Sequence, residues 1–346
     1  MLSNSADWLE RLSLATASLE AMTRAGSPDV SQSLGVHASE RRLGFGLPFW
    51  VNGMHAEDLG EAWPLFCQAL SESGCLVSNP IRDLAELPTN AIPTRLSVRH
   101  TGTSLHSLEV ATADAIVLSQ QDVVAARWGQ LAEVSLGGIG NETPKRMAGL
   151  IRSLRIAAGG NTPVGLSLPV GGDSTDVIAA SDAGCDFLLL EEHQHAERGS
   201  VAPETILGVA NVRRILNAQG QSSMPIVLSA RVGNVDEAIK LLALGADFVS
   251  IEAMLREAMP LDDQKEARES AGRLSSLVSI SSDDNSAVQR MQPVVECLSG
   301  LKSQLEAAMN LTGASTLHEF DASKITALDS QIAELCGLAV YGAPSS

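Results

Sequence analysis

The chain has 346 residues, of which 45% are hydrophobic, and it carries a formal net charge of −17. This length and apolar content are enough to bury one large core. The acidic balance argues against a nucleic-acid-binding protein, because no basic stripe is present to neutralise phosphates.

The first 25 residues predict neither a signal peptide nor a membrane span, because the acids Asp7 and Glu10 interrupt them and no continuous apolar core is present. Their apolar positions instead predict an amphipathic helix lying on the main body: Trp8, Leu12, Leu14, Leu19 and Met22. The five cysteines of the chain form no tightly spaced motif, which favours a reducing cytoplasm over a disulfide framework or a zinc site.

The next segments alternate between strand and helix signals. Residues 45–55 predict a buried strand, residues 56–73 predict a helix that Gly74 ends, and residues 75–80 predict a second strand. Three short apolar runs bounded by Gly, Asp or Asn predict further strands, at 95–98, 115–119 and 131–136. A helix then opens at Thr143 and continues through Leu154.

Residues 160–258 contain an internal repeat of two strand–helix–strand units. The segments of the first unit lie at 163–168, 173–183 and 184–192, and those of the second at 225–230, 234–244 and 245–252. Strands that are apolar without alternation are typical of parallel sheets, so the pattern predicts a doubly wound sheet or a (β/α)8 barrel. Nine strand candidates are one too many for a barrel, and we expect the surplus to be the run at 94–99 or a strand in an excursion.

Beyond Pro260 the composition becomes polar and helical, with helices expected at 261–275 and 290–311, a polar loop at 281–285, and a small helical cap from 312 to 337. The predicted fold is therefore an α/β TIM barrel, (β/α)8, with an N-terminal helix and a C-terminal helical extension. Its expected parts are an N-terminal helical segment and linker (1–34), the barrel (35–260) and the extension (261–346).

In a barrel, the residues just past the carboxyl ends of the strands form the working face. The densest ionisable cluster at such a position is Glu-Glu-His-Gln-His at 191–195. His193 and His195, with the nearby carboxylates, predict a metal site, although an exposed, solvated loop gives the same pattern. Glycine pairs at 137–138 and 171–172 are candidates to hold phosphate through backbone N–H groups, or are ordinary turns.

Arg231 follows a late strand, where barrels often bind phosphate, and it either binds an anion or pairs with an acid. The catalytic candidates on this face are Glu191, His193 and Ser167. The candidates for holding a cofactor are Asn52, Gly53, Asn79, Ser135, Ser229, Arg231 and Gly233.

Several segments follow one another in a familiar order. A Pro-Phe strand at 47–54, a helix, and the Gly-Cys-Leu-Val-Ser-Asn strand at 74–79 resemble the opening of the FMN-binding central domain of glutamate synthase, and 132–137 resembles its Ile-Glu-Ile-Lys-Met-Gly strand. The tail at 311–317 is similar to the end of the stand-alone members. The resemblance spans residues 45–340. It implies a barrel that holds FMN, reduces 2-iminoglutarate formed from 2-oxoglutarate and ammonia, and receives electrons through an iron–sulfur cluster.

The chain departs from that family at the residues that carry its chemistry. Ser135 and Ser167 stand where the family has lysines, and Ala-Arg-Val at 230–232 replaces its Asp-Gly-Gly phosphate loop. Glu252 brings a carboxylate to the place that the FMN phosphate should face. The three-cysteine run after Met254 is missing, so we expect no iron–sulfur cluster. These losses predict a catalytically degenerate barrel that has lost FMN and has a scaffolding or ligand-sensing role.

Two enzymatic alternatives stay open. One is an active FMN oxidoreductase of the glutamate synthase type, which acts on a 2-oxo or 2-imino acid through altered contacts. The other is a barrel enzyme that reuses the rim of Glu191, His193 and His195 with a metal. For partners, we expect neither nucleic acid nor membrane, and we expect a protein partner or a second copy of the chain to contact the acidic helical region after residue 261.

Overall fold

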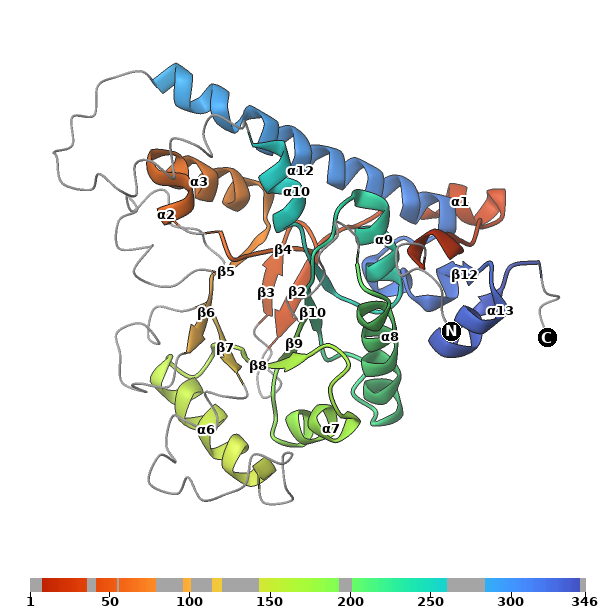
Figure 1. Ribbon diagram of the computed structural model, residues 1–346, viewed down its shortest axis with the longest axis horizontal. Helices are drawn as coiled ribbons and strands as arrows, with labels where there is room; N and C mark the ends of the chain where they lie inside the picture. Colours follow the sequence, from red (N-terminus) through yellow and green to blue (C-terminus); the bar gives the residue numbers. More distant parts are fainter. Residues whose placement is uncertain are drawn as a thin grey trace, which may run out of the picture.

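The centre of the protein is a closed barrel of parallel strands (Figure 1). The computed structural model describes residues 8–35, 42–54, 56–78, 96–100, 114–119, 143–192, 201–259 and 284–342. In chain order the barrel strands are β4 (Phe49–Asn52), β5 (Leu76–Ser78), β6 (Leu96–His100), β7 (Ala115–Ser119), β8 (Val164–Pro169), β9 (Phe187–Glu191), β10 (Ile226–Ser229) and β11 (Phe248–Ser250). Because β11 pairs in parallel with β4, the sheet closes on itself and the predicted (β/α)8 barrel is confirmed.

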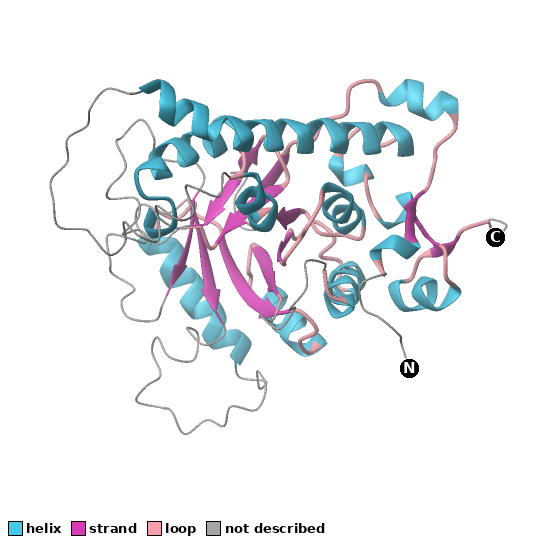
Figure 2. Ribbon diagram, turned by 45° about the horizontal axis from the view of Figure 1, so that its top comes forward, coloured by secondary structure: helices cyan, strands magenta, loops and turns pink. Residues whose placement is uncertain are grey.

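Helices cover the outside of this barrel (Figure 2). They are α2 (Ala56–Leu59), α3 (Trp63–Ser73), α6 (Thr143–Ala157), α7 (Ser174–Asp182), α8 (Pro203–Ala218), α9 (Val235–Ala243) and α10 (Glu252–Ala258). The helix predicted at 56–73 is present, although a 3-10 turn, η3 (Gly60–Ala62), divides it in two. Gly74 ends it in the left-handed region, with φ 72°, as the sequence predicts.

The expectation that 94–99 is a surplus strand is wrong. β6 pairs in parallel with β5 on one side and with β7 on the other, so it is a barrel strand. β7 in turn pairs directly with β8, from Ile116 beside Val164 onward. The ninth candidate, at 131–136, lies outside the described residues. Strand pairing decides which short apolar runs enter the barrel, and a single run carries no signal of its partners.

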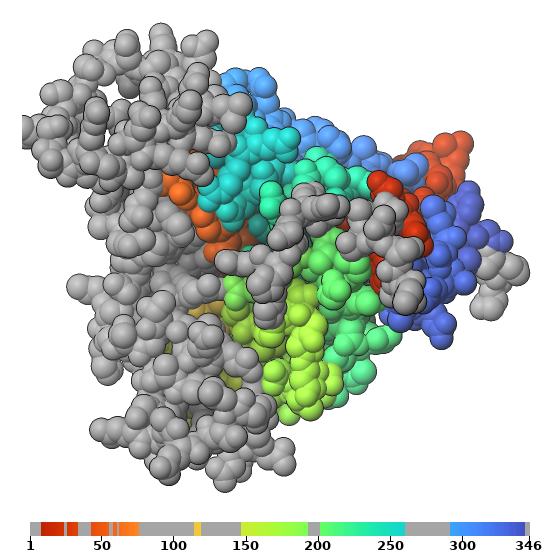
Figure 3. Space-filling view, in the orientation of Figure 1, coloured from red at the N-terminus to blue at the C-terminus, as the bar shows by residue number. Residues whose placement is uncertain are grey.

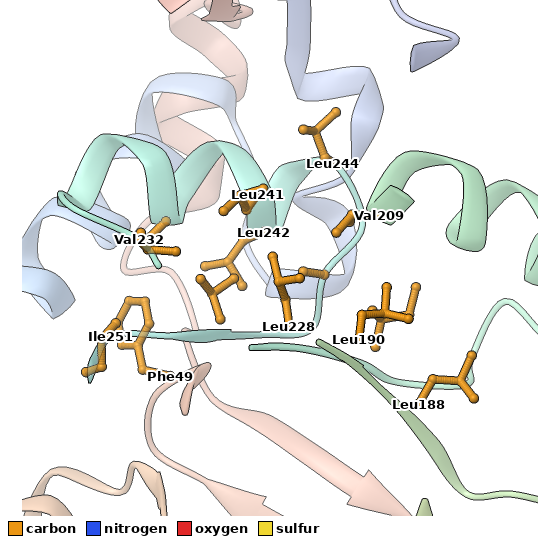
Figure 4. Packing of buried hydrophobic residues seen from close by; sticks show 14 of the residues in the cluster. Phe49, Leu188, Leu190, Val209, Leu228, Val232, Leu241, Leu242, Leu244 and Ile251 are labelled. Atoms are coloured by element: carbon orange, nitrogen blue, oxygen red, sulfur yellow. The ribbon is translucent and has the colours of Figure 1, made fainter. Parts of the chain in front are cut away.

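Alternation along the strands sends side chains either into the barrel or out toward the helices. The outward set packs against α8 and α9, as Leu228, Leu241 and Val209 show in Figure 4. The inward set is a smaller apolar cluster of Leu43, Phe45, Trp50, Ala115, Val117, Phe187, Leu189, Val227 and Phe248. The barrel interior is therefore a packed core, as in other barrels of this type.

A hairpin of β2 (Gln32–Gly35) and β3 (Arg42–Phe45) supplies part of that interior core. The Phe45 ring meets the Phe248 ring edge to face, with centroids 5.2 Å apart. Phe248 is the first residue of β11, so the hairpin lies at the amino end of the barrel strands. The opposite, carboxyl end is the one that carries the polar candidates.

The internal repeat is confirmed by a bonding pattern that occurs once in each unit. In the first unit, Asp186 accepts a 2.5 Å ion pair from Arg155 of α6 and a 2.8 Å hydrogen bond from the N–H at the start of β8. In the second, Asp247 accepts an ion pair from Arg213 of α8 and a 2.7 Å hydrogen bond from the N–H at the start of β10. Each aspartate thus joins two neighbouring strands, and the helix that precedes the first of them, at the amino end of the barrel.

The two ends of the chain meet in a small separate sheet. β1 (Leu12–Leu14) pairs antiparallel with β12 (Ile325–Ala327), which pairs parallel with β13 (Ala339–Val340). Figure 3 shows the red N-terminal residues against the blue C-terminal ones at one end of the molecule. The prediction of one helix through residue 25 is wrong before α1 (Leu19–Ala25), because pairing with a strand more than 300 residues away overrides local periodicity.

The C-terminal cap predicted at 312–337 is likewise only partly helical. It contains two 3-10 turns, η5 (Leu317–Glu319) and η6 (Ala322–Lys324), the helix α13 (Ser330–Cys336) and the strand β12. The domain boundary predicted at residue 260 stays a prediction, since residues 260–283 lie outside the described part of the chain.

A long helix, α12 (Asp284–Thr312), runs beside α3, α10 and α9 and reaches α1 (Figure 1). It confirms the helix predicted at 290–311 and begins earlier, so Asp284 and Asn285 are helical and not part of a loop. The helix predicted at 261–275 lies outside the described residues. The apolar side of α12 is buried on the barrel helices through Met291, Val294, Leu298, Leu301, Leu305 and Met309. Within the described ranges, no helix has both the length and the apolar run needed to cross a membrane.

Candidate functional site

The inward-facing positions change from apolar to polar toward the carboxyl ends of several strands, and on β11 the buried Ser250 lies two residues beyond Phe248. Asn52 lies two residues beyond Trp50 on β4, and Ser229 lies two beyond Val227 on β10. The same spacing applies to Glu191, two residues beyond Leu189 on β9. On β8, Ser167 lies two residues beyond Gly165, whose Cβ position faces the inward ring of Phe187. Since side chains alternate along a strand, these polar groups face the barrel axis above the apolar core. We call Asn52, Ser229, Glu191 and Ser167 the mouth arc.

Hydrogen bonds join the mouth arc in pairs. The Nδ2 of Asn52 donates to the Oγ of Ser229 at 3.3 Å, across the intervening strand β11. The hydroxyl of Ser167 donates to the Oε2 of Glu191 on the adjacent strand. Ser229 and Glu191 are register partners on neighbouring strands, so the two pairs are contiguous. Ser167 is buried at 4% exposure, whereas the other three are partly exposed at the mouth.

Glu192, the next residue after β9, points away from the mouth and holds three segments together. Its Oε1 accepts hydrogen bonds from the Ala202 N–H at 3.1 Å and the Thr205 hydroxyl at 2.6 Å, at the start of α8. Its Oε2 accepts the Arg231 N–H at 3.0 Å, in the loop after β10. Of the two adjacent glutamates, Glu192 is therefore structural and Glu191 faces the site.

The loop after β10 leads into the first turn of α9, and side chains bind one backbone N–H of the loop and one of the turn. The side chain of Asn234 caps the helix by accepting the Glu237 N–H at 3.0 Å. The Oε2 of Glu237 reaches back to accept the Gly233 N–H at 2.7 Å. Burial raises the pKa of Glu237, and these hydrogen bonds offset only part of the cost of desolvating its charge.

A second carboxylate lies at the start of α10, directly after β11. Glu252 receives a 2.8 Å hydrogen bond and ion pair from the Nε of Arg256, one helical turn later. Arg256 also donates to the Gly53 carbonyl at 2.8 Å and to Asp58 at 3.3 Å, which ties the loop after β4 to α10. Gly53 has φ +89°, and a Cβ there would lie 2.8 Å from the Oε2 of Glu252. The Glu252 side chain therefore fills the space beside Gly53.

The structure thus brings four of the predicted site residues together and separates three others. Asn52, Ser229, Glu191 and Ser167 meet in the mouth arc. Arg231 is exposed and contributes its backbone N–H to Glu192, while the Gly233 N–H is taken by Glu237 and Gly53 lies against Glu252. The remaining candidates lie outside the described residues: Asn79, Ser135, His193 and His195.

The glycine pair at 171–172 does not leave a free helix N-terminus. Asp173 caps α7 by accepting the Thr175 N–H at 3.0 Å, and this bond lowers the pKa of Asp173. The pair at 137–138 lies outside the described residues. Among the residues that the structure does describe, no group of three His, Cys, Asp or Glu side chains could hold a metal ion.

Sequence reasoning missed Glu237, Arg256 and the role of Glu192. Two of these had a local signal, because Asn234 and Glu237 have the three-residue spacing of a capping box and Arg256 lies four residues after Glu252. The bonds of Glu192 reach residues 10, 13 and 39 positions away, so no local pattern could reveal them.

Comparison with known proteins relates the chain to flavoenzymes through structure alone. No family model matches it, and no curated protein matches it in sequence. The recombinant flavin-binding domain of baker's yeast flavocytochrome b2 superposes with a TM-score of 0.58 at 12% identity, covering 99% of this chain and 81% of that one. A flavocytochrome b2 variant with benzoylformate gives 0.60 at 14% identity, with the same two coverages.

A mandelate oxidase variant carrying a C4a-OH-FMN adduct gives a TM-score of 0.56 at 14% identity and covers 90% of this chain and 86% of that one. At these identities the likeness shows the fold. The protein therefore shares its barrel fold with these structures, and its own residues must decide whether FMN fits.

The residues at the usual phosphate position do not fit FMN. Barrels commonly bind phosphate at the loops after the seventh and eighth strands, which here are β10 and β11. A helix N-terminus favours an anion by about 0.3–1 kcal/mol. Two like charges about 4 Å apart repel by roughly 4 kcal/mol at an effective dielectric constant of about 20. Glu237 and Glu252 occupy these two helix starts, so a phosphate at either start would meet a carboxylate, although Arg256 offsets part of the charge of Glu252.

Proposed function

We propose that this protein is a catalytically degenerate barrel of the FMN-oxidoreductase fold, with a scaffolding or ligand-sensing role. The observation that carries the proposal is the pair of carboxylates, Glu237 and Glu252, at the two helix starts where the phosphate would bind. The Glu237 carboxylate accepts the Gly233 N–H, and the Glu252 carboxylate is held by an ion pair with Arg256. The proposal therefore includes the loss of FMN and of any iron–sulfur cluster.

The mouth arc supports the same proposal. Where the glutamate synthase resemblance implies a lysine, Ser167 donates its hydroxyl to Glu191. A hydroxyl bonded to a carboxylate supplies no cation to hold a dicarboxylate or to polarise an imine. The inward-facing ends of β4, β8, β9 and β10 carry one amide, two hydroxyls and one carboxylate.

The test is the visible spectrum of the purified protein together with a turnover assay. We expect a colourless protein that does not reduce a redox dye when mandelate, lactate or 2-oxoglutarate with ammonia is supplied. A flavin absorption band in the protein as purified, with dye reduction by any of these substrates, would contradict the degenerate function.

The second candidate is an active FMN oxidoreductase acting on a 2-hydroxy, 2-oxo or 2-imino acid. The fold likeness to flavocytochrome b2 and mandelate oxidase structures favours it. It requires the FMN phosphate to be held away from the starts of α9 and α10. A yellow protein in which Glu252→Gln leaves the flavin content unchanged is the result that this candidate predicts.

We also propose a cytoplasmic location and a protein contact at the C-terminal region. All five cysteines are free thiols, which suits a reducing compartment. Since α12 packs its apolar side on the barrel, its outward polar side, with Gln292, Glu296 and Lys302, is the surface offered to a partner or a second copy. Size-exclusion chromatography with light scattering tests whether a second copy of the chain binds, and a monomeric mass would contradict that proposal.

A further inference from the structure

We propose that Asn52 is a modification site, at which attack by the backbone nitrogen of Gly53 converts the side-chain amide into a carboxylate. The reaction requires only water, so this inference goes beyond the proposed function and does not depend on it. The mouth arc then gains a carboxylate as the protein ages.

The reaction is a deamidation through a cyclic imide. The Gly53 nitrogen forms a bond to the Cγ of Asn52, the Cγ–Nδ2 bond breaks, and the proton of that nitrogen leaves with the amide group as ammonia. Water then opens the ring at either of its two carbonyls. One opening gives aspartate in place of Asn52, and the other gives isoaspartate, in which the main chain continues through the side-chain carboxyl carbon.

The local sequence favours this reaction at one position. Asn52 and Gly53 form the one Asn-Gly pair of the chain, and every other asparagine precedes a residue that has a side chain. A side chain on the following residue hinders the approach of its nitrogen, whereas glycine has no Cβ and reaches conformations that other residues avoid. Asn52 should therefore react ahead of the other asparagines.

The fold leaves this pair accessible. Asn52 is the last residue of β4 and is partly exposed, so water can reach the imide. Gly53 lies outside the strand with φ +89°, and among the described residues no group accepts its N–H. The sheet therefore does not hold the Gly53 nitrogen, which stays available for attack.

One hydrogen bond restrains the Asn52 side chain. Its Nδ2 donates to the Oγ of Ser229 at 3.3 Å, just beyond the range of roughly 2.7–3.2 Å that is usual for such a bond. A bond of this length slows the turning of the amide toward Gly53 and does not prevent it. Ser229 thus influences the rate of the reaction and not its position.

The product changes both the charge of the mouth and the loop after β4. Aspartate has no N–H to donate, so the present hydrogen bond to Ser229 is lost. The new charge lies next to Gly53, where the Oε2 of Glu252 is 2.8 Å from the position of a Cβ. Isoaspartate also lengthens the main chain by a methylene group, close to the Gly53 carbonyl that accepts a 2.8 Å hydrogen bond from Arg256.

The experiment is peptide mapping of the full-length protein by mass spectrometry after incubation at neutral and at mildly alkaline pH. Trypsin releases residues 43–82 as one peptide, fragmentation assigns the modified position, and chromatography separates aspartate from isoaspartate. We expect Asn52 to react first in the native protein, and faster at the higher pH, because the nitrogen attacks after losing its proton. Asn217, exposed at the end of α8 and followed by Ala218, is the control in the same digest and should stay intact.

Two variants test the chemistry. Ser229→Ala should speed the reaction of Asn52 by about 2- to 10-fold, the worth of one neutral hydrogen bond, and should leave Asn217 intact. Asn52→Gln keeps an amide at the site and should abolish the signal, because the larger ring that glutamine forms closes far more slowly.

Three results would overturn the inference. The first is an Asn52 that stays intact in the native protein while it converts in protein unfolded in urea. The second is conversion of Asn217 as fast as that of Asn52. The third is an unchanged rate for Asn52 in a Ser229→Ala variant whose circular dichroism spectrum matches that of the wild type. If Ser229→Ala does not fold, the first two comparisons still decide.

Discussion

The repeated aspartate–arginine pair gives an internally controlled test of what stabilises the barrel. The Asp186 side chain is fully buried and its partner Arg155 is 17% exposed, whereas Asp247 is 28% exposed and Arg213 is 16% exposed. Arg213 also donates to backbone carbonyls of residues 222, 224 and 245, so it stays bonded when its aspartate is neutralised. Within the part of the chain that the structure describes, Arg155 makes one such bond, at 3.3 Å to the carbonyl of residue 184.

Asp186→Asn should therefore destabilise the protein more than Asp247→Asn. Breaking a buried pair leaves an uncompensated charge and costs about 3–5 kcal/mol. For the second pair, solvent screening and the extra bonds of Arg213 reduce the expected cost to about 1–2 kcal/mol. In both variants the amide oxygen can still accept the strand N–H, and in Asp247→Asn the new amide N–H₂ also takes the place of the oxygen that accepts from Gln32 at 3.3 Å.

Chemical denaturation of the wild type and the two variants, followed by circular dichroism, measures the difference. We expect the midpoint for Asp186→Asn to fall clearly below that for Asp247→Asn. An equal drop in the midpoint for both variants, or a larger drop for Asp247→Asn, would show that burial and the hydrogen bonds of the arginine do not determine how much stability each pair contributes.

The remaining predictions concern other buried groups. A thiol reagent at neutral pH should modify only the half-buried Cys297 in the native protein and all five thiols after unfolding. The buried thiols are protected because burial keeps them protonated, as for Cys75, whose pKa it raises to about 12. Rapid modification of a second thiol in the native protein would contradict this prediction. Lys240→Met removes a 2.8 Å bond to the Leu9 carbonyl and should speed proteolysis of the N-terminal segment; an unchanged cleavage rate would count against that role. Burial raises the folded-state pKa of Glu237 above 4.5, so its stabilising contribution is present at low pH and falls as the pH rises through the folded-state value. As the pH rises through this value, the unfolding midpoint of the wild type should therefore fall relative to that of Glu237→Gln. A difference between the two midpoints that does not change with pH would refute the raised pKa of Glu237.

Local patterns predicted the barrel and most of its parts. The helix expected at 234–244 is α9, with Asn234 as its N-cap, because both periodicity and cap are local signals. The sequence also placed Glu191 and Ser167 at strand ends, and strand alternation then points both inward. These features depend on residues a few positions apart.

What sequence reasoning missed depends on distant partners. β1 is a strand because β12 lies beside it, and its own residues also fit a helix. Glu192 is structural because the start of α8 and the loop after β10 donate to it. The carboxylate at Glu252 was predicted to oppose phosphate from its position alone, whereas the matching carboxylate at Glu237 went unseen because its contact reaches back to Gly233.

We propose that the carboxylates of Glu237 and Glu252 take the place of an FMN phosphate at the starts of α9 and α10. Titration of the protein with FMN and with riboflavin, which lacks the phosphate, tests it most directly through quenching of flavin fluorescence. We expect FMN to bind no more tightly than riboflavin, and we expect Glu252→Gln to raise the affinity for FMN relative to that for riboflavin. Tighter binding of FMN than of riboflavin by the wild-type protein would contradict it.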